Sequence, residues 1–416
     1  MTFRHVDWLY PGIGLKRWLA LATGGGLALV YSLAVLAGVA WSDDLMRGLG
    51  WGAMTDRRLA AAVLALDGVV VGTAALAVGA RRVWLWRRTN PETASEIRAS
   101  TRLARGPRIA AVGGGNGLAA LLSGLKARTS NITAVVTMAD DGGSSGRLRR
   151  DMGLPPPGDI RNCLVALADD ESLMSRLFQY RFADGGLEGH SFGNLFVAAL
   201  AEVTGDFERA VQESTRVLKV RGRVLPSTLD DVVLHAQLED GGLVSGESTI
   251  TACDRLPRRV WLTPEEPHAL PQAVDAVLRA DMVVLGPGSL YTSVVPNVLI
   301  PVVRDALART RGWVVYVCNV MTEPGETDGY TAGDHLEALY RHGLAGMVDI
   351  VMVNDGPVTG DSAAAYERAG ATPVAVDEER LATMGVRVVR GDFAQMGQAV
   401  RHDPVRLSDA LLRILR

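Results

Sequence analysis

Cysteine is scarce in this chain: there are three cysteines in 416 residues, at positions too far apart to form a paired motif. A disulfide framework needs several cysteines and a zinc knuckle needs closely spaced pairs, so neither is expected. We expect Cys163, Cys253 and Cys318 to be reduced thiols in a cytosolic compartment. For Cys163 we predict a packing role, because no basic residue that would activate the thiol is evident beside it.

The chain also lacks a strong charge of one sign and several catalytic signatures. Its net charge is −3 and its sequence pI is about 6.2, so a basic face is not predicted and nucleic acid is not an expected partner. The absence of a G-x-x-x-x-G-K-[ST] element argues against a P-loop NTPase. Without an H-x-x-x-H or C-x-x-C motif, a structural metal is not expected.

Long apolar runs, by contrast, are concentrated in the first hundred residues. Trp18 to Ser42 is a run of 25 residues without charge, and the 22 residues from Leu59 to Ala80 contain only Asp67. Each run is long enough to cross a hydrocarbon layer of about 30 Å as a helix. Basic residues before the first run and after the second outnumber those between them, which favours both ends inside the cell. We therefore expect residues 1–86 to form a multi-pass transmembrane hairpin that holds a cytoplasmic domain at the cell membrane.

Two other interpretations of these runs remain open. The first run is compatible with a cleaved signal peptide ending near "AGVA" at 37–40, and the pair is compatible with a buried soluble hairpin. The glycines of "TGGGLALVYSLAVLAG" favour close packing of two helices. Residues 87–106 are polar and are expected to be a linker, which leaves 107–416 as the main domain.

A glycine-rich turn opens the main domain. "RIAAVGGGNGLAALLSGLKAR" predicts a strand at 108–112, a loop at 113–117 and a helix at 117–127. Within it, Gly115-x-Gly117-x-x-Ala120 fits a relaxed dinucleotide fingerprint, in which backbone N–H groups at a helix N-terminus bind phosphate. The alternative is a tight turn with no ligand. The candidate binding residues here are Gly113, Gly114, Gly115, Asn116 and Gly117.

Several further apolar runs each end in a polar loop that contains glycine. "NITAVVTMADD" ends at Asp140 and Asp141, and buried strands are predicted at 282–286 and 313–318 and within "MVDIVMVNDGP". Parallel α/β sheets bind ligands at the carboxyl ends of their strands, so these loops are expected to meet at one site. The candidates after the later strands are Gly286, Gly288, Ser289, Thr292 and Asn319. A helical region is expected at about 160–235, followed by a small β section, and no chemistry is assigned to 362–416.

The segment 139–162 is predicted to be a long ligand-binding loop. Asp140 and Asp141 are expected to accept hydrogen bonds from sugar or ribose hydroxyls, and Arg147 and Arg161 to bind a diphosphate. Arg149 and Arg150 are assigned to a solvated face. Asp159 is expected to orient Arg161 or to hold a divalent ion, the alternative being a buried Asp–Arg pair that fixes the loop. Further candidates are Gly143, Ser144, Asn162, His190 and Asn194, of which His190 is expected to be a structural hydrogen-bond partner.

With these blocks in order, the chain resembles the bacterial gluconeogenesis factor family, which is homologous to the 2-phospho-lactate transferase of deazaflavin cofactor synthesis. The resemblance covers about residues 107–360 and rests on Gly113–Gly117 and on "ADDGGSSGRLR", "PPGDIRN", "GHSFGN", "LGPGSLYTSVVPN", "CNVMTEPGETDGY" and "DHLEAL". It implies an α/β fold with a modified Rossmann-like parallel sheet and helices on both faces. It also implies binding of UDP-N-acetylglucosamine or another UDP-sugar, and regulation of carbon metabolism, cell shape and envelope synthesis under gluconeogenic growth.

Two function classes follow, a UDP-sugar-binding regulator and a transferase. The transferase alternative uses a nucleotide diphosphate donor, with Mg²⁺ and Asp140 or Asp159 at the reacting centre. The first glycine loop lacks the Thr-Pro-Lys continuation associated with the transferase branch, which favours the regulator. An NAD-dependent oxidoreductase is a third interpretation, although no hydride-transfer constellation is evident. The expected partners are the nucleotide sugar, the membrane and a second copy of the chain.

Overall fold

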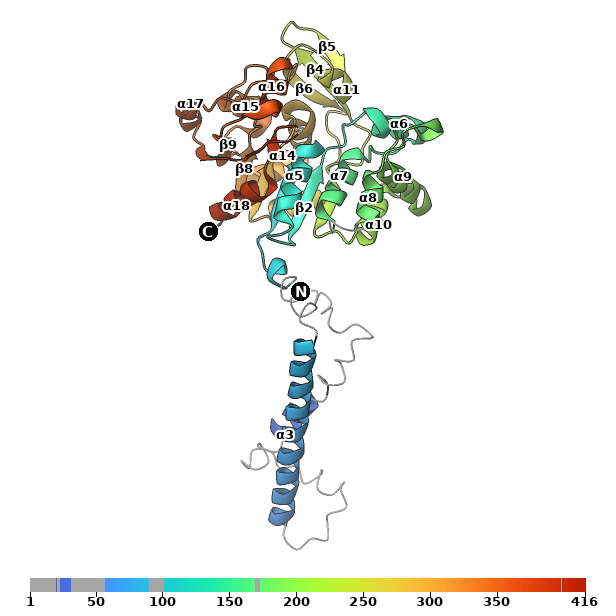
Figure 1. Ribbon diagram of the computed structural model, residues 1–416, viewed down its shortest axis with the longest axis vertical. Helices are drawn as coiled ribbons and strands as arrows, with labels where there is room; N and C mark the ends of the chain where they lie inside the picture. Colours follow the sequence, from blue (N-terminus) through green and yellow to red (C-terminus); the bar gives the residue numbers. More distant parts are fainter. Residues whose placement is uncertain (1–19, 21–22, 31–56, 90–100, 169–172, 398) are drawn as a thin grey trace. The chain divides into compact units, whose positions relative to one another are not determined.

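The computed structural model of the chain describes residues 20, 23–30, 57–89, 101–168, 173–397 and 399–416. The chain divides into two compact units, Met1–Thr101 and Arg102–Arg416. Figure 1 shows both units, with the chain coloured from blue at the N-terminus to red at the C-terminus.

In the first unit, two helical segments pack closely at glycine. Residues 23–30 are helical, and helix α3 (Arg57–Thr89) contains the second apolar run. A Cβ added to Gly25 would lie 2.8 Å from the carbonyl oxygen of Gly72, and one added to Gly72 would lie 2.9 Å from that of Gly25. The two backbones therefore touch, as the glycine content of the first run predicts.

The structure gives the predicted transmembrane hairpin no support. Among the described residues, no helix is both long enough and apolar enough to cross a membrane. Most of the first apolar run, 18–42, lies outside the described residues.

A seven-stranded sheet forms the centre of the second unit, with the strand order β10-β9-β8-β7-β1-β2-β3. Every neighbouring pair in it is parallel. Its strands are β1 (Ile109–Gly113), β2 (Ile132–Val136), β3 (Arg223–Pro226), β7 (Met282–Leu285), β8 (Trp313–Val317), β9 (Ile350–Asn354) and β10 (Arg387–Gly391). The strands expected near 108–112, 282–286 and 313–318 are thus confirmed within one or two residues, because their runs are apolar and buried on both faces.

The order in which the strands are added to the sheet reverses at β1, which has β2 on one side and β7 on the other. Val112 of β1 is paired in register with Val135 of β2 and with Leu285 of β7. From β1 the chain builds β2 and β3 outward, and it later returns to build β7 to β10 in the opposite direction. Ligands in open α/β sheets bind at such a reversal, outside the carboxyl ends of the strands.

Helices flank this sheet (Figure 1). They are α5 (Gly115–Leu125), α6 (Gly143–Met152), α7 (Gly158–Leu167), α8 (Leu173–Gln179), α9 (Phe192–Thr204), α10 (Phe207–Val217), α12 (Pro271–Leu278), α13 (Val295–Val298), α14 (Pro301–Arg309), α15 (Ala332–Leu339), α16 (Gly360–Arg368), α17 (Glu378–Thr383) and α18 (Pro404–Ile414). A π-helical turn, Leu290–Val294, precedes α13.

The prediction of one long loop at 139–162 is wrong, because α6 occupies its middle and α7 begins at Gly158. Helix α6 ends at Gly153, which takes the left-handed conformation with φ 66° and is the usual residue for such a C-cap. Arg149 and Arg150 lie in the last turn, where positive charge complements the helix dipole. The Gly, Ser and Asp content of 139–162 therefore predicts a loop although part of this segment is helical.

The expected helical region 160–235 is correct for α7 to α10, but it also contains β3 of the main sheet. After β3 comes the small β section predicted from sequence. It is an antiparallel sheet of β5 (Leu243–Ser245), β4 (Val233–Leu238) and β6 (Pro257–Thr263), with the short helix α11 (Glu247–Thr251) between β5 and β6. Near the C-terminus, β11 (Ala394–Gln395) pairs with β12 (Arg401–His402).

Candidate functional site

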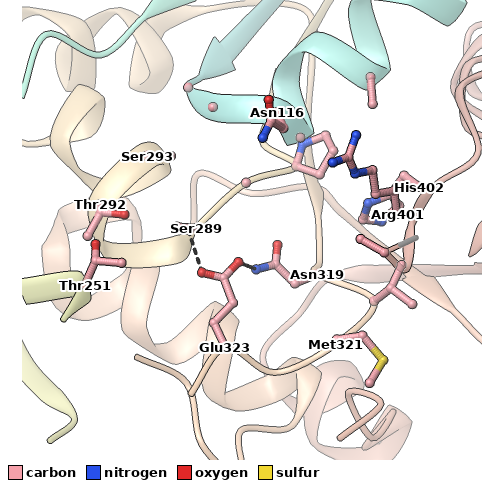
Figure 2. Close-up of a pocket in the computed structure, with 18 of the residues that line it drawn as sticks. Asn116, Thr251, Ser289, Thr292, Ser293, Asn319, Met321, Glu323, Arg401 and His402 are labelled. Atoms are coloured by element: carbon pink, nitrogen blue, oxygen red, sulfur yellow. Dashed lines mark hydrogen bonds between the residues drawn. The ribbon is translucent and has the colours of Figure 1, made fainter. Parts of the chain in front are cut away.

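A cavity of about 530 Å³ opens at the carboxyl ends of β1, β2, β7 and β8, where the sheet reverses. Its size is in the range of small-molecule sites. Figure 2 shows the side chains that surround it. The lining residues are Gly114, Gly115, Asn116, Gly117, Ala120, Thr137, Asp140, Asp159, Glu247, Thr251, Pro287, Gly288, Ser289, Thr292, Ser293, Asn319, Val320, Met321, Thr322, Glu323, Tyr366, Ala399, Val400, Arg401 and His402.

The glycine loop after β1 is both a tight turn and a wall of this cavity. Gly115 has φ 64°, which a residue with a side chain rarely adopts. A Cβ on Gly117 would lie 2.5 Å from the carbonyl oxygen of Pro287, so the start of α5 touches the loop after β7. Helix α5 begins with no side-chain cap, which leaves most of its first N–H groups available to a ligand.

A hydrogen-bonded trio forms the facing wall. The Glu323 carboxylate accepts hydrogen bonds from the Ser289 hydroxyl at 2.5 Å and from the Asn319 amide at 3.0 Å (Figure 2). Behind it, buried Glu326 accepts from the backbone N–H of Tyr291 at 2.6 Å. Burial, with the neighbouring Glu323 charge, raises the pKa of Glu326 well above its ordinary value.

Three carboxyl groups line one end of the cavity: Asp140 after β2, Asp159 at the start of α7, and Glu247 on α11. Burial raises the pKa of Asp159 to about 6, and the Asp140 charge adds to this shift. Burial also raises the pKa of Glu247 to about 7, with further contributions from the charges of Asp140, Asp141 and Asp159. The pKa of Asp140 is raised chiefly by burial. A raised carboxyl pKa in a cavity is typical of binding or catalytic groups.

A cation lies at the other end. Figure 2 shows Arg401 and His402 across the cavity from Thr251, with Asn319 and Glu323 between them. Arg401 is exposed and has no ion pair with any described residue, whereas His402 is buried and its Nε2–H donates to the carbonyl of Cys318. Burial lowers the pKa of His402 to about 4, so its ring is neutral. Among the described residues that line the cavity, Arg401 is the single arginine or lysine.

No site residue is predicted in 362–416, but Tyr366, Arg401 and His402 line the cavity. Glu247 and Thr251 were also outside the predicted set. No short motif marks any of them: α11 follows the small antiparallel sheet, and β12 follows β10 at the far end of the chain. Only the folding of distant segments onto the ends of β1 and β8 brings these residues to the site.

The predicted residues divide between the cavity and a second cluster. Those that line the cavity are Gly114, Gly115, Asn116, Gly117, Asp140, Asp159, Gly288, Ser289, Thr292 and Asn319. Those outside its lining are Gly113, Asp141, Gly143, Ser144, Arg147, Arg161, Asn162, His190, Asn194 and Gly286. Whether any of them binds a ligand stays a prediction.

The second cluster joins the N-terminal parts of α6 and α9. Ser144 Oγ lies 3.0 Å from His190 Nδ1 and accepts from the Asn194 amide at 3.1 Å. Desolvation, with the nearby Arg147 charge, lowers the pKa of His190. Arg147 donates to the carbonyl of Glu188 at 2.8 Å.

The arginines and Asp141 lie differently from the predictions. Arg161 donates to Asn162 Oδ1 at 2.6 Å and forms no ion pair with Asp159 or any other described residue. Asp141 accepts from the Ser248 N–H at 2.8 Å and so anchors α11. Assigning Arg149 to a solvated face is wrong, because only 13% of its side chain is exposed and it pairs with Asp231 at 2.5 Å.

Comparison with known proteins finds one family across most of the second unit. The family model for 2-phospho-L-lactate transferase CofD matches residues 109–394. A protein of Bacillus subtilis named gluconeogenesis factor is 48% identical over 74% of this chain and 98% of its own length. One of the same name from Halalkalibacterium halodurans is 47% identical over 73% of this chain and 95% of its own.

Other relatives extend the similarity to the fold and to the first unit. A crystal structure of a Bacillus halodurans protein superposes with a TM-score of 0.72 and 47% identity, covering 74% of this chain and all of that chain. A relative from Nostoc sp. is 43% identical over 98% of this chain and 91% of its own length, so the similarity there reaches into the N-terminal unit.

Proposed function

This chain belongs to the gluconeogenesis factor branch of the 2-phospho-L-lactate transferase CofD family, and on that premise we propose that it is a nucleotide-sugar-binding regulator. The ligand is a UDP-sugar such as UDP-N-acetylglucosamine, bound in the cavity at the reversal of the sheet. Occupancy of the cavity regulates carbon metabolism and envelope synthesis through a surface that a partner protein reads.

The observation that carries this proposal is the arrangement of the cavity walls. Beyond the Gly115 N–H, which donates to Asp159, the start of α5 supplies backbone N–H groups, and Arg401 supplies a guanidinium that pairs with phosphate oxygens. Hydroxyl and amide groups of Ser289, Thr292 and Asn319 are placed for ribose or sugar hydroxyls. Together these groups match a ligand in which a diphosphate is flanked by hydroxyl-bearing groups on both sides.

The test is titration calorimetry of the full chain with UDP-N-acetylglucosamine and UDP, comparing Arg401→Ala with Arg161→Ala. Arg401 lines the cavity and Arg161 does not, although both are arginines of this domain. Loss of one arginine–phosphate contact is expected to weaken binding about tenfold to a hundredfold in Arg401→Ala. Absence of binding by the unmodified chain up to about millimolar ligand, where the free energy is near −4 kcal/mol, would reject the proposal.

One observation favours the transferase as a second candidate. The carboxyls of Asp159 and Glu247, with pKa values of about 6 and 7, have the properties of groups that accept or donate protons near neutral pH. In the transferase alternative, Mg²⁺ and Asp140 or Asp159 act at the reacting centre. Consumption of a nucleotide diphosphate donor by the purified chain, abolished in Asp159→Asn, would support this candidate over the regulator.

A further inference from the structure

The two ends of the cavity carry opposite charge. The acidic end is formed by Asp140, Asp159 and Glu247, and the cationic end by Arg401. Thr251 marks the acidic end in Figure 2, because its hydroxyl lies 3.0 Å from the Glu247 carbonyl oxygen and 3.4 Å from Glu247 Oε1. Arg401 lies on the opposite side of that view from Thr251, and Asn116 of the glycine loop lies at the top between them.

The carboxyls of the acidic end are close to one another and to the loop that begins α5. A Cβ on Gly158 would lie 3.1 Å from Asp140 Oδ2, and Asp159 is the next residue. A Cβ on Gly114 would lie 2.5 Å from Asp159 Oδ2. Asp141 tethers α11 to the loop after β2 through the Ser248 N–H, which keeps Glu247 beside them.

No described residue neutralises this end by an ion pair. Arg149 and Arg161 are near enough to act on Asp140 and Asp159 through space, but Arg149 is paired with Asp231, and Arg161 bonds Asn162. An anionic group bound at the acidic end is therefore repelled by carboxylates that no described cation compensates and that are partly shielded from solvent. Hydroxyl or amide N–H groups, by contrast, find carboxylate acceptors there.

We propose that the acidic end of the cavity selects nucleotide sugars with an uncharged sugar and excludes those whose sugar bears a carboxylate. The inference rests on the proposed function, because it assumes that a nucleotide sugar occupies the cavity. Its diphosphate lies toward Arg401, and its sugar lies among Asp140, Asp159 and Glu247. Exclusion is electrostatic, since hydroxyls and a carboxylate of similar size differ chiefly in charge.

The test is titration calorimetry of the full chain with UDP-glucose, UDP-N-acetylglucosamine and UDP-glucuronate at about pH 8, above the pKa values of about 6 for Asp159 and about 7 for Glu247. UDP-glucuronate differs from UDP-glucose by a carboxylate in place of the hydroxymethyl group. Like-charge repulsion at protein-surface dielectric is expected to make it at least about tenfold weaker. Runs with Mg²⁺ and with a chelator reveal whether a divalent ion bridges the ligand to the carboxyls.

The variants assign the effect to the acidic end. Glu247→Gln is expected to reduce the ratio of the dissociation constants of UDP-glucuronate and UDP-glucose at least about threefold. Glu239→Gln changes an exposed glutamate away from the cavity and is expected to leave that ratio unchanged. Binding of UDP-glucuronate within about threefold of UDP-glucose in either buffer overturns the inference and leaves the proposed function standing. The inference is also overturned if Glu247→Gln leaves the affinity ratio of UDP-glucuronate and UDP-glucose unchanged. Failure of all three sugars to bind rejects the proposed function itself.

Discussion

The carboxylate of Asp159 lies directly against the α-carbon of Gly114, so that a Cβ built on Gly114 would come within 2.5 Å of Asp159 Oδ2. The same carboxylate accepts a hydrogen bond from the backbone N–H of Gly115. These contacts join the glycine loop after β1 to the first turn of α7. The absence of a side chain at Gly114 therefore allows the Asp159 carboxylate to approach the backbone closely, in addition to its role in the turn.

Replacing Gly114 by alanine is expected to destabilise the fold by about 1–3 kcal/mol through overpacking and to weaken UDP-N-acetylglucosamine binding. The backbone at Gly114 is extended, with φ −167°, so an alanine suffers no conformational strain there. The added methyl would collide with Asp159 and with Thr137 Cγ2, which is 2.7 Å away. Urea unfolding measures the stability, and calorimetry measures the binding.

Gly186→Ala is the matched control, because a Cβ there meets no heavy atom within 4 Å. It is expected to change neither stability nor binding. Equal stability of Gly114→Ala and the parent chain would contradict the close contact between Gly114 and Asp159.

Stability is expected to depend on pH through Glu247. Its pKa is raised from 4.5 to about 7, so the folded state holds the proton more tightly than the unfolded chain. The contribution of this tighter proton binding to the free energy of unfolding is fully present below about pH 4.5 and is lost as pH rises through about 7. Glu247→Gln removes this loss and should be more stable than the parent by about 3 kcal/mol at pH 8, with little difference near pH 4.

Urea unfolding of both proteins between pH 4 and pH 8 checks this prediction, with Glu239→Gln as a control for an exposed glutamate. A Glu247→Gln variant that is less stable than the parent at pH 8 would show that the carboxylate is stabilised in the fold, contrary to the direction of its pKa shift.

Glu326 is expected to tolerate glutamine but not alanine. Its carboxyl is buried, burial raises its pKa well above the ordinary value, and it accepts a hydrogen bond from the Tyr291 N–H. Glutamine keeps an acceptor for the Tyr291 N–H and an N–H donor toward Glu323, so the loss of folding stability should stay below about 1 kcal/mol. Alanine leaves the N–H without an acceptor and opens a cavity, which should cost about 2–4 kcal/mol. Similar midpoints for the two variants in urea would contradict the hydrogen-bonding role.

Arg149 and Arg150 are neighbours in α6 with different surroundings. Arg149 donates to Asp231 and to the carbonyl of Val232, both at 2.5 Å, whereas Arg150 is exposed. Arg149→Ala is expected to destabilise the fold by about 1–3 kcal/mol and Arg150→Ala by less than about 0.5 kcal/mol. Thermal unfolding of the pair tests the difference, and equal losses would mean that Arg149 does not anchor α6.

The elements that sequence reasoning located correctly are those whose signal is local. The strands at 109–113, 282–285 and 313–317 are short apolar runs followed by glycine or polar residues, and their environment in a parallel sheet is buried on both faces. The glycine loop was recognisable because its residue type is needed for the backbone geometry of Gly115. Both signals depend only on residues adjacent in the chain.

Helix α6 was missed because its first four residues, Gly143–Gly146, have weak helix propensity, and its last turn is held by the contact of Arg149 with Asp231 and Val232. That contact joins positions 82 and 83 residues apart. The same reason applies to Arg401, which reaches the cavity from the β12 strand at the far end of the chain.

The sequence by itself determined the family, the parallel α/β class and the cavity residues that lie in glycine-rich or polar motifs after the strands, because these depend on motifs and on the pattern of apolar residues. Only the tertiary structure decided which charges face a ligand. Asp140, Asp159, Glu247 and Arg401 come from four separate elements or loops, and they meet because the sheet reverses beside β1. Electrostatic character of a site is a sum over distances in space, which spacing along the chain does not provide.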